Sequence, residues 1–169
     1  EASLQKEVDN ESSQSNLRYF AGDLREKLTI ANLLSATLDS FDRVDILINA
    51  SRQMMASDLL DLNDNSVETL LNQNFMTSLR LSQLIATRMI KQSGSQTEGQ
   101  AGAIVNLSSI AARRAHPQLL GYSVSTAALD QMTRAMAVAL APHRIRVNAV
   151  AFGSVMSASL QDMLKDNSD

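Results

Sequence analysis

Cysteine is absent from this sequence of 169 residues. That absence excludes disulfide frameworks and thiolate metal sites, and it fits a reducing compartment, so we expect a cytoplasmic protein. No apolar run approaches the length of a membrane span, and the opening EASLQKEVDN has no basic segment followed by an apolar one. We therefore expect neither a membrane partner nor a targeting signal.

A stripe of basic residues is missing as well. The formal net charge is -3, and the Lys and Arg residues are scattered along the chain. Nucleic acid is therefore not an expected partner. The sequence has 2 histidines, His116 and His143, in loop-like segments with no carboxylate or second histidine at ligand spacing. We expect no metal site.

What is present is an alternation of two kinds of apolar segment. Short runs rich in β-branched residues alternate with longer runs of helical spacing, which is typical of βαβ units. Strands are expected at 17–24, 44–51, 103–109 and 145–153, and helices at 26–41, 67–91 and 119–141, with the end of a further helix at 1–8. The length fits one domain over 1–169. The pattern predicts an α/β fold with a mostly parallel sheet covered by helices on both faces.

Short polar motifs follow one another along these elements. They are GDL (22–24), NAS (49–51), Asn74 within NQNF, NLSS (106–109), YSVST (122–126) and RVNAVAFG (146–153). Taken in this order, they resemble the short-chain dehydrogenase/reductase (SDR) family, whose forms are D-[VL], N-A-G, a helix asparagine, S-S, Y-x-x-x-K and R-V-N-x-[VI]-x-P-G. The resemblance implies a three-layer, Rossmann-like doubly wound parallel sheet. It also implies NAD- or NADP-dependent interconversion of a small carbonyl compound and a secondary alcohol.

The resemblance assigns catalytic roles to three residues. Tyr122 would be the acid/base, Ser109 would hold the substrate oxygen, and Asn74 would support a water-linked proton path. Hydride transfer needs such groups, because the oxygen exchanges a proton and its developing charge needs stabilisation. The implied cofactor contacts lie beyond the carboxyl ends of the strands. They are Asp23 and Leu24 at the adenine, Asn49, Ala50 and Ser51 on the adenosine side, Thr126 at the motif's lysine position, and Gly153, Val155 and Ser157 at the nicotinamide amide.

Thr126 is the main departure from the family's motifs. The lysine usually found there binds the nicotinamide ribose and holds a positive charge near the tyrosine hydroxyl. A unit charge at about 5 Å in an effective dielectric near 20 is worth about 3 kcal/mol. Losing a charge-assisted hydrogen bond to the ribose removes roughly 1.5 to 3 kcal/mol more. We expect impaired activity, above all in alcohol oxidation, which needs the phenolate.

A glycine-rich turn is also absent. The family begins with a strand, a turn of the form G-x-x-x-G-x-G and a helix whose amino end binds the pyrophosphate. Nothing in the sequence matches that turn. We expect residues 1–169 to lack the first β-α-β unit and the C-terminal end of the family's fold, and so to form an incomplete Rossmann-like dinucleotide-binding domain.

Two long helices bear on assembly. The segments near 67–91 and 119–141 are apolar over more than one stripe, and in the resembling family such helices form a subunit interface, so a homodimer or homotetramer is expected. Two alternatives stay open: a non-catalytic SDR homologue acting as an assembly or ligand-sensing subunit, and a generic α/β domain with accidental matches. The substrate and the choice between NAD and NADP also stay open.

Overall fold

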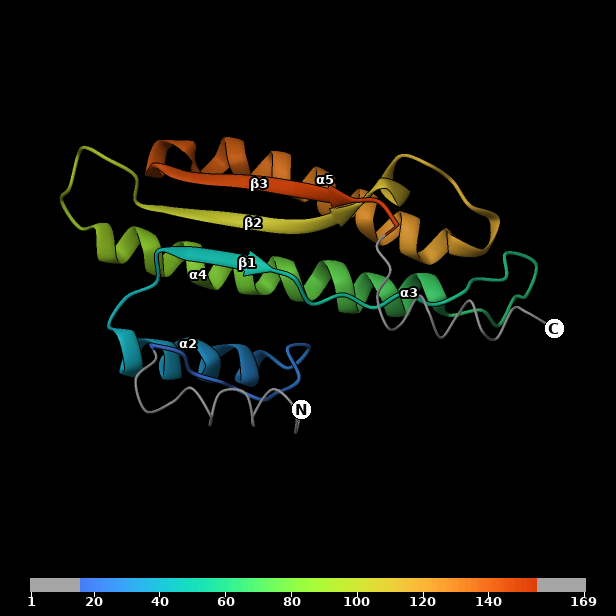
Figure 1. The fold of residues 1–169 in the computed structure, drawn as a ribbon, viewed down its shortest axis with the longest axis horizontal. Helices are drawn as coiled ribbons and strands as arrows, with labels where there is room; N and C mark the ends of the chain where they lie inside the picture. The colour runs from blue at the N-terminus through green and yellow to red at the C-terminus, as the bar shows by residue number, and fades with distance from the viewer. Residues whose placement is uncertain (1–15, 155–169) are drawn as a thin grey trace.

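A parallel sheet forms the centre of the molecule. The structure is a computed structural model, and it describes residues 16–154. Within that part of the chain the sheet has 3 strands in the order β1-β2-β3. They are β1 (Ile46–Asn49), β2 (Gly102–Ser109) and β3 (Ile145–Phe152), and both neighbouring pairs run parallel (Figure 1). The expected α/β class is confirmed.

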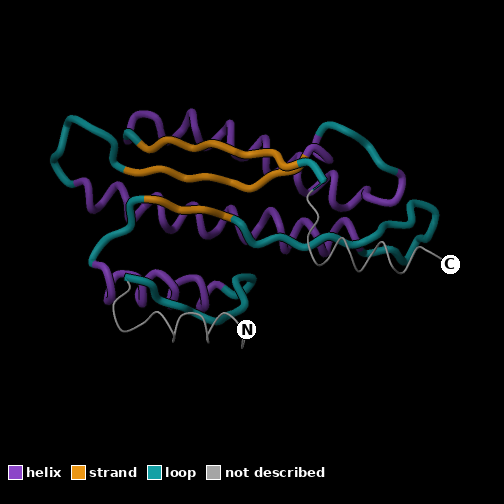
Figure 2. Tube along the Cα trace, viewed as in Figure 1, coloured by secondary structure: helices purple, strands orange, loops and turns teal. Residues whose placement is uncertain are grey.

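Helices connect the strands and lie along one face of the sheet. The main ones are α2 (Lys27–Phe41), α3 (Ser66–Leu70), α4 (Thr77–Ser93) and α5 (Leu120–Leu140). A π-helical segment, η1 (Leu71–Met76), joins α3 to α4 without a break. Short 3-10 turns are η2 (Ile110–Ala112), η3 (Pro117–Leu119) and η4 (Ala141–His143). Figures 1 and 2 show α4 and α5 behind the strands and α2 beside α4. No described helix is long and apolar enough to traverse a bilayer.

The apolar core lies between the sheet and this helix layer. Met89 of α4, Ile104 of β2 and Ile145 of β3 are fully buried there, and Val147 of β3 is buried beside them. Gly102 permits this close packing, because a Cβ at its position would stand 2.4 Å from the Met89 sulfur. The β-branched residues of the strands thus pair with long flexible side chains of the helices.

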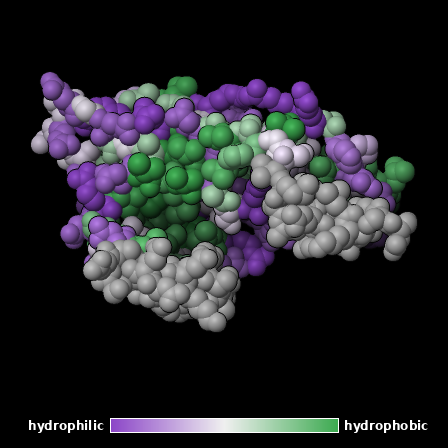
Figure 3. Space-filling view, in the orientation of Figure 1, coloured by the Kyte–Doolittle hydropathy of each residue, from purple (hydrophilic) through white to green (hydrophobic). Residues whose placement is uncertain are grey.

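The opposite face of the sheet carries exposed apolar side chains. Ile46 and Ile48 of β1 are 62% and 59% exposed, and Val150 of β3 is 46% exposed. Figure 3 shows the resulting hydrophobic area over the strands. Residues alternate between the two faces of a strand, so these side chains point away from the helices. Among residues 16–154, no helix covers this face.

The strand expected at 17–24 is wrong. Residues 16–23 have no regular secondary structure, and no described strand pairs with them. Their apolar content suggested a strand, but a strand needs a neighbour to bond its backbone groups. The expected helix end at 1–8 lies outside the described residues.

Candidate active site

The carboxyl ends of the strands bring several motif residues to one edge of the sheet. Asn49 ends β1 opposite Asn106, and Ser109 ends β2 opposite Phe152. Gly153 follows directly and is exposed. Ligands of open α/β sheets bind beyond this edge. Two expected cofactor contacts, Val155 and Ser157, lie outside the described residues.

Ser109 sits where β2 turns into η2. Only 8% of the residue is exposed, and its hydroxyl oxygen accepts a hydrogen bond from the Ala111 N–H at 3.2 Å. A hydroxyl that accepts one hydrogen bond still has its hydrogen to donate. Ser109 is therefore held in place by the turn, and its hydroxyl hydrogen remains available to donate.

Tyr122 lies in the first turn of α5 and is 4% exposed. The packing of that turn depends on Gly121, since a Cβ there would stand 2.8 Å from the backbone of Ser66. The Gly121 N–H donates to the Ser57 hydroxyl at 3.0 Å. These contacts bring the start of α5 against α3 and fix the backbone that carries the tyrosine.

Arg52 is the partner of the tyrosine hydroxyl. Its Nη1 donates to the Tyr122 hydroxyl oxygen at 2.9 Å, across 70 positions of sequence. The sequence motifs did not identify this residue. A signal was available, because Arg52 follows the NAS motif at the carboxyl end of a strand, where ligands of such sheets bind.

Asn74 lies in the π-helical segment, and such wide turns often occur at functional sites. It is 3% exposed, and its carboxamide bonds both backbone groups of Gln53. The oxygen accepts from the Gln53 N–H at 2.7 Å, and the nitrogen donates to the Gln53 carbonyl at 2.9 Å and to the Ser125 hydroxyl at 3.2 Å. Asn74 thus fastens the loop that carries Arg52 to the helices.

Thr126 turns its hydroxyl onto its own helix. The residue is 3% exposed, and its Oγ1 donates to the carbonyls of Tyr122 at 2.8 Å and Ser123 at 3.1 Å. This is the usual backbone hydrogen bond of a helical threonine. The hydroxyl therefore serves α5, and Thr126 places no charge beside the tyrosine.

A hollow of about 310 Å³ gathers other expected cofactor contacts. Its lining residues are Gly22, Asp23, Leu24, Arg25, Ser51, Arg52, Gln53, Gln73, Asn74 and Thr77. Ala50 is exposed at the start of the same loop. The fold therefore brings the GDL segment and the loop after β1 together, although they lie far apart in sequence.

Asp23 and Arg25 form an ion pair at this hollow. The Arg25 Nη2 lies 2.5 Å from the Asp23 Oδ2, and its Nε bonds both carboxylate oxygens at 2.9 Å. Hydrogen bonds from the Arg25 side chain and backbone lower the pKa of Asp23 from 3.8 to about 2. The carboxylate is therefore ionised at neutral pH and already engaged by a cation.

The side chain of Asn49 serves the interior of the fold. Its nitrogen donates to the Ser82 hydroxyl at 2.9 Å and to the Asn106 carboxamide oxygen at 2.7 Å. The Asn106 nitrogen in turn donates to the Thr133 hydroxyl at 2.9 Å. All four residues are buried. This buried polar chain links α4, β1, β2 and α5.

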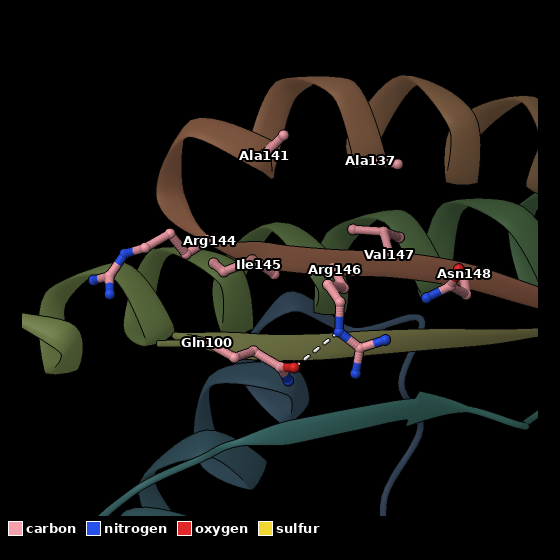
Figure 4. A pocket seen from close by; sticks show the side chains of 8 residues that line it. All are labelled: Gln100, Ala137, Ala141, Arg144, Ile145, Arg146, Val147 and Asn148. Atoms are coloured by element: carbon pink, nitrogen blue, oxygen red, sulfur yellow. Dashed lines mark hydrogen bonds between the residues drawn. The ribbon is translucent and has the colours of Figure 1, made fainter. Parts of the chain in front are cut away.

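Another hollow, of about 530 Å³, lies beside the exposed edge of β3 (Figure 4). Arg146 lines it and donates to the Gln100 side chain at 2.8 Å. Gln100 precedes β2 and Arg146 is near the start of β3, so this hollow lies at the opposite end of the strands from Ser109. No group of metal-ligating side chains occurs among the residues that the structure describes.

Comparisons with known proteins agree on one family. The family model described as short chain dehydrogenase matches residues 1–168. L-xylulose reductase of Mus musculus is 36% identical over 113 residues, which cover 67% of this chain and 44% of the relative. Carbonyl reductase [NADPH] 2 of Sus scrofa is 32% identical over 123 residues, which cover 73% and 48%.

Solved structures show the same fold. A short-chain dehydrogenase/reductase from Burkholderia xenovorans superposes with a TM-score of 0.82 at 24% identity, over 97% of this chain and 62% of that one. The chain spans about half the length of the curated relatives that it matches. With a family match over nearly every residue, the chain belongs to the short-chain dehydrogenase/reductase family.

Proposed function

We propose that this protein is an NAD(P)-dependent oxidoreductase that interconverts a carbonyl and a secondary alcohol. The observation that carries the proposal is the buried Tyr122 hydroxyl, which accepts a hydrogen bond from the Arg52 guanidinium. A phenol beside a cation is suited to exchange a proton with a substrate oxygen. Ser109, at the end of β2, supplies a hydroxyl for the same oxygen.

The residues of the hollow fit the adenosine part of a dinucleotide. Asp23, Leu24 and Ser51 line it together at the carboxyl edge of the sheet, which is where such sheets bind nucleotides. The exposed Gly153, after β3, suits the nicotinamide part. A bound nicotinamide would supply or accept the hydride. The protein's own residues would position the substrate and move the proton.

Each catalytic residue has a separate task in this proposal. In the reductive direction, Tyr122 donates its proton to the carbonyl oxygen, while the Ser109 hydroxyl donates a hydrogen bond to that oxygen and stabilises its charge. Asn74 holds the loop after β1 through Gln53. The same proposal gives Asn74 a second task, the support of a water-linked path for the proton.

We expect binding of the cofactor to be weak. The hydroxyl of Thr126 is used within α5, so the ribose hydroxyls lack the charged partner that the family's lysine provides. The loss of that bond corresponds to about 1.5 to 3 kcal/mol, or roughly ten- to a hundredfold in affinity.

The names of the relatives suggest the first substrates. They include an L-xylulose reductase and an NADPH-dependent carbonyl reductase. We therefore propose small ketoses and simple ketones as the substrate class. The assay supplies each candidate substrate with NADPH or with NADH, and the absorbance of the reduced cofactor measures its oxidation.

The test compares two variants with two matched controls. Ser109→Ala and Tyr122→Phe are each expected to lower kcat at least about a hundredfold. Ser108→Ala and Tyr19→Phe should leave it within about twofold, because Ser108 is the adjacent strand residue on the other face and Tyr19 lies outside the site. Unchanged turnover in Tyr122→Phe would exclude the proposed mechanism.

A second candidate is a non-catalytic homologue that senses a ligand or assembles with a partner. The inward-turned hydroxyl of Thr126 favours it. Saturable binding of NADH or NADPH, without turnover of any tested carbonyl or alcohol, would select this candidate. Turnover that depends on Tyr122 would reject it.

We also propose a homodimer or homotetramer formed through 67–91 and 119–141. Those segments are helical, and α5 presents Val138 at 78% exposure and Val124 at 37% exposure. Exposed apolar side chains on a long helix suit a partner helix better than water. Burial against a second copy would remove them from solvent.

A further inference from the structure

We propose that Arg52 is the positioning residue that supplies, beside the Tyr122 hydroxyl, the positive charge that the family's lysine supplies from position 126. This inference rests on the proposed function and names a residue for it. Arg52 reaches the tyrosine from the loop after β1, whereas the lysine of the motif would reach it from one helical turn further along α5. The 2.9 Å hydrogen bond is direct.

The chemistry of the guanidinium group fixes the direction of this bond. Arginine has only donors and stays charged at any ordinary pH. The Tyr122 oxygen must therefore accept, and its own hydrogen remains for another acceptor. In carbonyl reduction, that hydrogen passes as a proton to the carbonyl oxygen while the carbon takes a hydride from reduced nicotinamide. The phenolate left behind lies against the guanidinium until water reprotonates it.

The loop geometry supports a specific position for Arg52. The neighbouring Gln53 is held through its N–H and its carbonyl by the buried Asn74. The backbone next to Arg52 is therefore fixed to the π-helical segment. Asn74, the residue expected on the proton path, thereby also helps to place the cation.

The carboxylates near Arg52 have other cationic partners, so its guanidinium bonds the Tyr122 hydroxyl. Asp23, across the same hollow, is engaged by Arg25. On the other elements packed near the tyrosine, Arg113 of the turn after β2 lies 3.9 Å from Asp130 of α5. Among the described residues, no carboxylate forms an ion pair with Arg52.

In this proposal Arg52 performs one of the two tasks of the family's lysine. It provides charge at the hydroxyl, but its hydrogen bond to Tyr122 gives no contact at the place where position 126 meets the ribose. Changes at position 52 should therefore alter the proton step and the turnover. Changes at position 126 should alter the affinity for the cofactor.

The first experiment needs no turnover. The sequence has 2 tyrosines, so the near-ultraviolet absorption band of tyrosine in a Tyr19→Phe background reports Tyr122 alone. Arg52→Met should shift this band at neutral pH, because the phenol oxygen loses the charged donor that it contacts at 2.9 Å. Arg52→Lys should keep the band close to its position in the parent. The same band position in the parent and in Arg52→Met would overturn the inference.

Circular dichroism of each variant shows whether the fold is intact. Arg52 is exposed apart from this contact, so Arg52→Met should fold as the parent does. The comparison of Arg52→Lys with Arg52→Met holds side-chain length similar and changes the charge. An absorption band that shifts equally in both variants would also contradict a role for charge.

The second experiment is a double-mutant cycle in turnover. Arg52→Met should lower kcat about tenfold or more, with little change in the KM for NADPH or NADH. Adding Thr126→Lys to that variant should recover kcat, whereas in the parent it should mainly lower the cofactor KM. Equal effects of Thr126→Lys on kcat in both backgrounds would overturn the inference. If the parent has no turnover, the proposed function fails, while the tyrosine absorption band still decides whether Arg52 acts on Tyr122.

Discussion

The pKa of the exposed Asp23 carboxyl is strongly lowered by Arg25, a neighbour two positions away. Hydrogen bonds from Arg25 lower the pKa of the carboxyl to about 2. A folded-state pKa below the unfolded value means that the ion pair favours the folded protein above about pH 4. This contribution is lost as the pH falls through about 2. The pair is exposed, so its effect on stability is small at any pH.

We expect the Asp23 carboxyl carbon to titrate by NMR with a midpoint near 2 in the parent. Arg25→Gln removes the guanidinium, and the midpoint should then return toward 3.8, the ordinary value for aspartate. Arg43→Gln is the control, because its partner is Asp45. A midpoint that ignores Arg25 would show that the ion pair does not persist in solution.

The sequence motifs named candidate site residues one by one, but they did not predict the contact between Arg52 and Tyr122. Tyr122, Ser109 and Asn74 follow from local motifs whose order along the chain is visible. Arg52 meets the tyrosine only because the fold brings the end of β1 beside the start of α5. A motif records residue types at fixed spacing, so it misses a side chain that arrives from another element.

At the scale of elements, the π-helical segment joins the loop after β1 to the helix layer. Asn74→Ala would leave the N–H and carbonyl of Gln53 without their partner. We expect a loss of about 1 to 3 kcal/mol in the free energy of unfolding, measured by urea denaturation. Asn72→Ala, an exposed position in the same segment, should change it by less than about 0.5 kcal/mol.

A stability of Asn74→Ala equal to that of Asn72→Ala would mean that water replaces the two backbone hydrogen bonds without loss. The loop after β1 would then be held by other contacts. Asn74→Asp distinguishes the two bonds, because a carboxylate still accepts from the Gln53 N–H but cannot donate to its carbonyl.

The elements themselves were largely predictable. The three described strands and the helices at 27–41, 66–93 and 120–140 lie within a few residues of the expected ranges. Apolar spacing indicated them, because the helices bury an apolar stripe and the strands carry short apolar runs. The same spacing indicated a strand at 17–24, where no strand among residues 16–154 pairs with the backbone. It gave no sign of the π-helical segment, since one extra residue in a turn barely alters an apolar stripe.

At the scale of the whole molecule, exposed apolar residues on α5 bear on assembly. Val138→Glu places a charge on the proposed helix interface, where burial would cost the carboxylate its hydration. We expect the dimer dissociation constant to rise at least about tenfold, or ~1.4 kcal/mol. Sedimentation velocity over a range of concentrations measures it.

Leu28→Glu is the matched control for that prediction. Leu28 is 72% exposed on α2, outside both proposed interface helices, so its substitution should leave association unchanged. Equal weakening by both variants would indicate general repulsion between charged surfaces. Unchanged association in Val138→Glu would place the interface elsewhere.

The pairing of β1 with β2 determines which residues of the whole sheet share a face. At the carboxyl end of that pair, Asn49 lies opposite Asn106, and their carboxamides bond directly. A slip of one residue would move Asn49 to the face that carries Ile46 and Ile48 and would leave the Asn106 oxygen buried without its donor. The two asparagines therefore favour one alignment of β1 with β2. A sheet with another alignment would lose these polar contacts, and Asn49 would no longer lie opposite Asn106 at the carboxyl edge.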